Sequence, residues 1–159
     1  MRVVAAAAAT LAVSAMCAVP ALAGAPNGRV TGGGQNPLGG TTGPGSTIAF
    51  EAHQGSGNTA TGNVQFIDRS SGTGQNQVKY HGTIECLFFD SNNSAQMYGH
   101  DRNGNLFELF VMDNGEGATG GNDIASFNNS PQGDCSNPDQ SDEGSDQLFR
   151  GNAQVYEPQ

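Results

Sequence analysis

The residues with the clearest potential for chemistry are four oxygen-bearing side chains in one glycine-rich segment: Asp113, Asn114, Glu116 and Asp123. Calcium takes six to eight oxygen ligands, and a glycine-rich turn lets several carboxylates and carbonyls converge on one ion. The spacing is not that of an EF-hand, because no D-x-[DN]-x-[DN]-G run with a glutamate at its twelfth position is present. We therefore expect either a calcium site or a hairpin loop, since Asp, Asn and Gly also favour turns.

Other acidic side chains offer weaker sites. A polar stretch at 128–146 contains five of them, which we interpret as a solvated acidic loop: Asp134, Asp139, Asp142, Glu143 and Asp146. Glu85 and Glu108 would suit glycoside hydrolysis if they were held about 5–10 Å apart in a cleft. Both fall on the polar side of predicted strands, which predicts solvated side chains and disfavours a hydrolase.

The histidines and the hydroxyl groups form no recognisable catalytic pattern. His53, His81 and His100 are scattered, and no G-x-S-x-G nucleophile elbow is present. We predict surface positions for all three histidines and no catalytic residue in the chain.

The first 23 residues have the layout of a secretory signal peptide. Arg2 precedes an apolar run at 3–19, and Ala21-Leu22-Ala23 follows Pro20 with small residues where a signal peptidase cuts. The alternative is a retained membrane anchor, but the run is short for a span of about 20 residues. We expect cleavage after Ala23, a secreted product and no membrane insertion afterwards.

The cysteines agree with export. Cys17 would leave with the signal peptide, so only Cys86 and Cys135 remain. Two cysteines in an oxidising compartment have a single possible pairing. A bridge closing a loop of about 50 residues stabilises a fold by about 3–4 kcal/mol on the chain-entropy model. Two free thiols are the alternative.

The charge excludes some partners. The whole chain carries six basic and fifteen acidic side chains, and Arg2 is the basic residue that export removes. The expected net charge then falls from −9 to −10. Such a surface repels nucleic acids and anionic membranes but attracts cations.

The elements predicted after the signal are all strands. Residues 24–46 form a Gly/Pro-rich arm with room for a short strand at 29–31, and 47–159 form one all-β domain. Alternating apolar and polar residues mark strands near 47–52, 62–68, 78–88, 95–99, 106–112, 123–127 and 148–156. We predict a single antiparallel β-barrel or β-sandwich of seven to eight strands.

Two segments matter for the site. The longest alternation, 78–88, places Val78, Ile84, Cys86 and Phe88 on one face and polar residues on the other. The polar stretch at 128–146 is long for a loop in a compact domain, and a bridge from Cys135 would pin it. Gly32-Gly33-Gly34 has no following Lys-Ser/Thr or helix, so we interpret it as tight backbone packing rather than a phosphate loop.

Five short motifs follow one another along the chain: the T-G-G-G-Q opening at 31–35, G-N-V-Q-F-I-D at 62–68, Y-H-G-T-I-E-C-L at 80–87, V-M-D-N-G-E-G at 111–117 and G-N-A-Q-V-Y at 151–156. In this order they resemble small secreted actinobacterial proteins of the post-COAP domain type. In the family pattern a proline usually follows the Gly-Glu pair, where this chain has Gly117. The resemblance implies a small extracellular all-β domain and no activity.

Three functions remain open from the sequence. The first is a secreted, non-enzymatic β-domain that acts by surface or extracellular interaction. The second is a barrel that binds a small apolar ligand, and the third is a hydrolase using paired carboxylates. No cofactor is expected apart from the calcium considered above, and the partner and the oligomeric state stay open.

Overall fold

The computed structural model describes residues 28–36, 45–69, 77–90, 93–115, 123–139, 146–148 and 150–158. The segment at 1–23 therefore lies outside the described residues. The described chain forms eight strands: β1 (Arg29–Asn36), β2 (Ser46–Gln54), β3 (Thr59–Asp68), β4 (Val78–Asp90), β5 (Ser94–Asp101), β6 (Leu106–Met112), β7 (Ile124–Asn128) and β8 (Arg150–Tyr156). Within these ranges no helix is long and apolar enough to cross a membrane.

All eight strands belong to one antiparallel sheet with the order β7-β6-β5-β4-β3-β2-β1-β8. Each strand from β1 to β6 pairs with the next along the chain, and β8 returns to the free edge of β1. The sheet curls into a nearly closed barrel whose two edge strands are β7 and β8. The predicted all-β antiparallel fold with seven to eight strands is confirmed.

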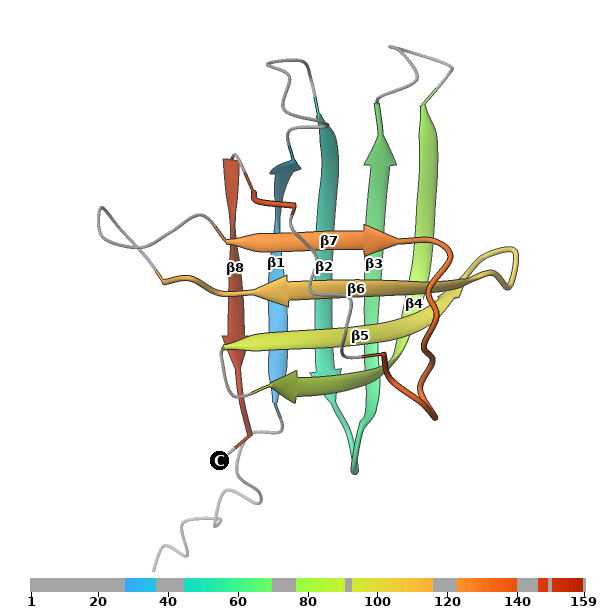
Figure 1. Ribbon diagram of the computed structural model, residues 1–159, viewed down its shortest axis with the longest axis vertical. Helices are drawn as coiled ribbons and strands as arrows, with labels where there is room; N and C mark the ends of the chain where they lie inside the picture. Colours follow the sequence, from blue (N-terminus) through green and yellow to red (C-terminus); the bar gives the residue numbers. More distant parts are fainter. Residues whose placement is uncertain are drawn as a thin grey trace, which may run out of the picture.

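The sheet folds over on itself through one bent strand. In Figure 1, β8, β1, β2, β3 and the start of β4 run upright, whereas β5, β6 and β7 lie across them. The end of β4 turns and runs alongside β5, so that β4 belongs to both layers. The register between β4 and β5 shifts between Ile84 and Cys86, which leaves Glu85 as the extra residue of a bulge. Bulges bend strands, which explains why the chain turns here.

The bulge corrects the predicted faces of 78–88. One extra residue reverses the alternation, because side chains along a strand point to opposite faces in turn. Ile84 and Leu87 are both fully buried in the core, on either side of the bulge. Cys86 and Phe88 were predicted on the same face as Ile84, but they point outward instead.

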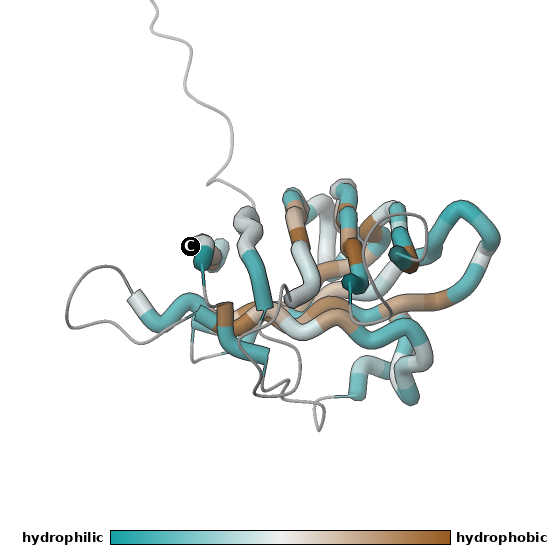
Figure 2. The backbone as a smooth tube through the Cα atoms, turned by 90° about the horizontal axis from the view of Figure 1, so that it is seen from above, coloured by the Kyte–Doolittle hydropathy of each residue, from teal (hydrophilic) through white to brown (hydrophobic). Residues whose placement is uncertain are grey.

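The interior of the barrel is filled by side chains from both layers. In Figure 2, brown hydrophobic segments occur both in the upright strands and in the strands that cross them. Ile48 and Val64 meet Met97 and Leu109 there, and each is at most 1% exposed. At one end, Phe127 stacks with Phe66 at a centroid distance of 4.7 Å and with Phe107 at 5.6 Å.

The glycine run lies in the middle of a sheet strand. A Cβ on Gly33 would lie 2.7 Å from the carbonyl oxygen of Ile48 on β2, and one on Gly34 would lie 2.3 Å from that of Arg150, the first residue of β8. The interpretation of this run as tight backbone packing is therefore confirmed. The strand is longer than the predicted 29–31, so the sheet begins inside the segment that the sequence assigns to an arm.

Candidate functional site

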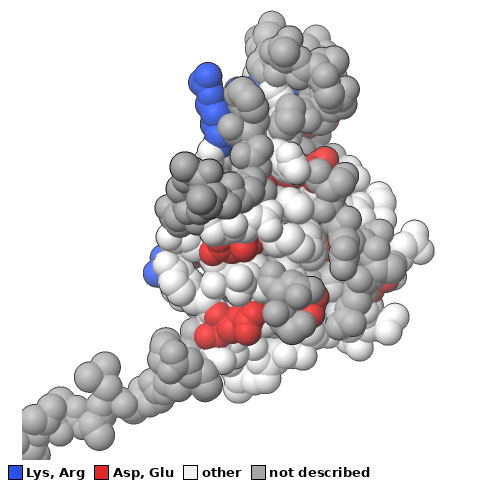
Figure 3. Space-filling view, turned by 60° about the vertical axis from the view of Figure 1, so that its left-hand side comes forward, with Lys and Arg blue, Asp and Glu red and all other residues white. Residues whose placement is uncertain are grey.

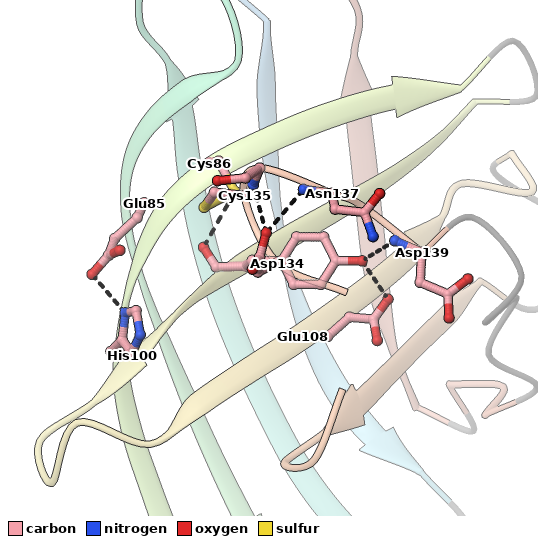
Figure 4. Close-up of a disulfide and its surroundings, with 10 residues drawn as sticks. Glu85, Cys86, His100, Glu108, Asp134, Cys135, Asn137 and Asp139 are labelled. Carbon is pink, nitrogen blue, oxygen red and sulfur yellow. Dashed lines mark hydrogen bonds and ion pairs between the residues drawn. A yellow bond between two sulfur atoms is a disulfide. The ribbon is translucent and has the colours of Figure 1, made fainter. Parts of the chain in front are cut away.

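The loop after β7 is fixed to the outside of the barrel by a disulfide. Cys86 of β4 and Cys135 are bonded, with a Cα–Cα distance of 5.7 Å, as the cysteine count predicts. Asp134 shapes the loop, because its carboxylate accepts hydrogen bonds from the backbone N–H groups of Ser136 (2.7 Å) and Asn137 (2.9 Å). The bridge forms only because the bulge turns Cys86 outward, toward this loop (Figure 4).

The loop covers a network of polar side chains on β5 and β6. Glu108 is only 2% exposed, and its carboxylate accepts hydrogen bonds from the Gln96 amide, the Tyr98 hydroxyl (3.3 Å) and the Asn128 amide (3.4 Å). The Tyr98 hydroxyl also accepts a hydrogen bond from the backbone N–H of Asp139 (2.9 Å). Burial, with a smaller contribution from the neighbouring Glu108 carboxylate, raises the pKa of Tyr98 to about 12.

This network corrects one expectation for the paired carboxylates. Glu108 does point outward, but it is covered by the loop rather than solvated, because the disulfide holds 129–139 over it. Glu85 is exposed as predicted. Figure 4 shows the disulfide between the two carboxylates, and each is bonded to different partners. They do not converge in one cleft.

The exposed neighbour of Glu85 is His100. The Nδ1 atom of His100 lies 3.1 Å from a carboxylate oxygen of Glu85, across adjacent strands. The turn that follows β5 is organised by Asp101, whose carboxylate accepts hydrogen bonds from the backbone N–H groups of Asn103 and Asn105, each at 2.8 Å. The side-chain amide of Asn105 also donates to Asp101, at 3.0 Å, and this bond, followed by the backbone bond from Asn105, lowers the pKa of Asp101 below its usual value.

A polar cleft opens beside this pair on the outer surface. Its volume is about 430 Å³, and it lies over β3, β4 and the turn after β5. The lining residues are Asn63, Val64, Gln65, His81, Gly82, Thr83, His100, Asp101 and Arg102. The register explains the grouping, because Asn63 pairs with Thr83 and Thr83 pairs with His100, which places three polar residues in one row across the sheet.

The cleft presents side chains that have hydrogen-bonding capacity to spare. The side chains of Asn63, Gln65, His81, Thr83 and Arg102 have no hydrogen bond to any other described residue. On the face shown in Figure 3, by contrast, acidic side chains form red patches and basic ones lie only at the margins. The cleft thus combines two imidazoles and a guanidinium in a chain of net charge −9.

Three of the residues proposed as calcium ligands, Asp113, Asn114 and Asp123, lie at the seam between the two sheet edges. Asp123 is 6% exposed. Its two carboxylate oxygens accept hydrogen bonds from the backbone N–H groups of Asn114 (3.0 Å) and of Ala153 in β8 (2.6 Å). The Asp113 carboxylate accepts a hydrogen bond from the backbone N–H of Val155, also in β8 (3.4 Å). The structure therefore gives these carboxylates backbone partners.

The remaining part of the calcium prediction concerns residues that the structure does not describe. Glu116 lies outside the described residues, as do Asp142 and Glu143 of the acidic loop. Within the described ranges, no three or more His, Cys, Asp or Glu side chains are grouped closely enough to hold a metal ion. The calcium site stays a prediction.

A short segment strengthens the same seam. Gln147 forms a β-bridge with Ile124 of β7, and the backbone N–H of Ala125 donates to the carbonyl of Asp146 at 3.1 Å. The side-chain amide of Asn36, at the end of β1, donates to the carbonyl of Ala125 at 2.7 Å. The two edges are thus joined by side chains and by this bridge, in place of a regular ladder.

The cleft was not predicted from the sequence. His81 and His100 were predicted as surface residues; His100 is exposed, and His81 is half-buried. The only usable signal was that His81 occupies a polar position of the predicted strand 78–88 and that His100 directly follows the next predicted strand, 95–99. Comparison with protein-family models, with curated proteins and with solved structures finds no match. The resemblance to post-COAP proteins therefore stays a prediction.

Proposed function

We propose that this chain is an exported, non-enzymatic β-domain that acts in the extracellular space by binding a polar partner or ligand at the cleft over β3, β4 and β5. The observation that carries the proposal is the set of side chains lining it. Two amides, the His81 imidazole, a hydroxyl and a guanidinium line one opening without hydrogen-bond partners among the described residues. Polar groups placed in a concave surface are what fixes the orientation of a ligand.

The interior argues against the apolar-ligand alternative. A barrel that holds a small apolar molecule needs space along its axis. Here Ile84 and Met97 are fully buried inside the barrel. The Phe107 ring packs against Gly82 so closely that a Cβ at Gly82 would lie 2.3 Å from a ring carbon. The described interior is occupied by the protein's own side chains.

The carboxylates argue against the hydrolase alternative. Glu108 is held by three neutral donors beneath a disulfide-bonded loop, and Glu85 is paired with His100. A glycosidase needs two carboxyl groups facing one sugar ring across a gap. The polar cleft has only Asp101 among its lining carboxylates, and that side chain is engaged by its own turn.

The test is a titration of the ¹⁵N-labelled protein with three probes: glucuronate as an acidic polar ligand, glucose as a neutral one, and laurate as an apolar one. We expect a polar probe to shift backbone amide signals of β3–β5 around Thr83, and Thr83→Val to reduce that shift. The matched control is Thr61→Val, an exposed β3 position that does not line the cleft. Laurate shifts centred on core residues would favour the apolar-ligand barrel, and unchanged cleft signals with both polar probes would overturn the proposal.

Export has a separate test. The intact mass of the product recovered from the culture medium should match a chain beginning at Gly24 with one disulfide. Retention of the full-length chain in the cell fraction would contradict export.

A further inference from the structure

The two histidines of the cleft are diagonal neighbours on adjacent strands. Thr83 of β4 pairs with His100 of β5, and His81 lies two residues before Thr83 on the same strand face. Diagonal neighbours of this kind have Cβ atoms about 7 Å apart. Both rings line the same opening. An imidazole nitrogen binds a metal at about 2.0–2.1 Å, so one ion held between the rings can span this separation.

Glu85 prepares His100 for such a role. A carboxylate accepts hydrogen bonds and cannot donate one, so the Nδ1 atom that lies 3.1 Å from Glu85 carries the proton. The Nε2 atom of the neutral ring then carries the free lone pair. Metal-binding histidines usually donate their other ring N–H to a carboxylate in the same way, which fixes the ring and raises its basicity.

We propose that the cleft binds a divalent transition-metal ion, copper(II) before nickel(II) or zinc(II), through His81 and the Nε2 atom of His100. This inference rests on the proposed function, because it names a ligand for the same cleft. Imidazole suits these three metals, and copper(II) binds most tightly in the general order of divalent ions. With two protein ligands the remaining coordination positions are open to water or to a polar partner.

The surrounding charges are compatible with a cation. Glu85 and Asp101 carry negative charge beside the two rings, and Arg102 carries the one fixed positive charge among the lining residues. Asp101 is held by the amides of its turn, and Glu85 contacts the metal site only through His100. Glu85 is therefore a positioning residue.

The chain supplies its own control for a surface histidine–glutamate pair. The Nε2 atom of His53 lies 3.0 Å from Glu51, with side-chain exposures of 52% and 56%. The His100–Glu85 pair is similar, at 3.1 Å and with exposures of 46% and 49%. The two pairs differ in their neighbours. Thr61 and Arg29 lie opposite His53 on the adjacent strands, whereas Thr83, which lies opposite His100, has His81 two residues before it.

The experiment is a calorimetric titration of the untagged protein with copper(II) and, separately, zinc(II) near neutral pH, with paramagnetic broadening by copper(II) to locate the ion. We expect one ion per chain, broadening centred on residues 81–83 and 99–101, and a Kd raised about tenfold or more by His81→Ala or His100→Ala. Glu85→Gln should weaken binding several-fold, whereas His53→Ala should leave the Kd unchanged. All four positions are at least partly exposed, and an unchanged melting temperature checks that each variant folds.

Two results would overturn the metal site: a Kd changed less than twofold by both cleft histidine variants, or an equal loss in His53→Ala. If metal binding fails while a polar probe still shifts the signals around Thr83, the proposed function stands and only this inference falls. If the probes fail and the metal binds, the metal ion is the ligand of the cleft and the binding of a polar organic partner there falls.

Discussion

Asp123 offers the sharpest test of how the barrel is closed. Its two carboxylate oxygens join Asn114, which follows β6, to Ala153 in β8, at 3.0 and 2.6 Å, and the side chain is 6% exposed. β7 and β8 form no regular ladder with each other, so this carboxylate replaces part of the missing hydrogen bonding. Removing it should release the seam.

The size of the effect follows from the two bonds. A hydrogen bond to a charged group contributes about 1.5–3 kcal/mol, and a buried N–H left without an acceptor costs its desolvation. We expect Asp123→Ala to lower the free energy of unfolding by about 3–5 kcal/mol, since two such bonds are lost. Asp123→Asn keeps one acceptor oxygen but turns an NH₂ group toward a backbone donor, so its loss should be smaller, about 2 kcal/mol.

Urea unfolding followed by circular dichroism measures these losses. Glu157→Gln removes a negative charge from an exposed side chain just after β8 and serves as the control for charge alone. If Asp123→Ala and Glu157→Gln differ by less than about 1 kcal/mol, the reasoning about the seam is refuted. A wild-type melting temperature that rises by several degrees in millimolar calcium and falls with a chelator would instead support the calcium prediction.

Three further predictions concern the disulfide, the covered tyrosine and the central strand. Cys135→Ser should lower the free energy of unfolding by about 4 kcal/mol on the chain-entropy model, given a sequence separation of 49, and dithiothreitol should do the same to wild type; an unchanged urea midpoint would contradict this. The pKa of Tyr98 is about 12 in the fold against 10.0 in the open chain, so its contribution to stability is complete below pH 10 and is lost as the pH rises toward 12; Tyr98→Phe should lack this loss in alkaline urea titrations. Gly33→Ala should lower the free energy of unfolding by about 1–3 kcal/mol, because its Cβ would clash with the Ile48 carbonyl oxygen. A variant that melts at the same temperature as the wild type would show instead that the strand shifts to accept the Cβ.

The sequence predicts the strands well where one face is apolar and the other polar. In β2, Ile48, Phe50 and Ala52 are buried as the alternation predicts, while Glu51 is exposed. Because a one-residue slip would bring Glu51 into the core, this register is strongly specified. The same logic accounts for the correct antiparallel fold class.

The prediction failed at β4 for a physical reason. Residues 86–89 are Cys, Leu, Phe and Phe, so either alternation places apolar side chains inside. Nothing in the pattern therefore reveals the extra residue at Glu85, which is detected only through the partners of β4 on either side. The site shares this limit, since the neighbours of His81 and Thr83 depend on cross-strand register.

Acidic residues were the hardest to interpret from type alone. An aspartate oxygen can either coordinate calcium or accept a hydrogen bond from a backbone N–H group. The residue type does not distinguish the two roles, and only the surroundings do. Asp123 and Asp113 lie where β8 presents N–H groups to them, and that juxtaposition arises from a strand more than 25 residues later in the chain. No local motif carries such information.

The bulge at Glu85 links the two functional features of the outer surface. Before it, His81 and Thr83 point outward into an open cleft; after it, Cys86 points outward and holds a loop against the barrel. Without the extra residue, Cys86 would face the core and could not reach Cys135, and Glu108 would lose its cover. Glu85 itself is exposed, as the alternation predicts, and holds the ring of His100. The bulge at Glu85 therefore separates the part of β4 that lines the open cleft from the part that the disulfide-bonded loop covers.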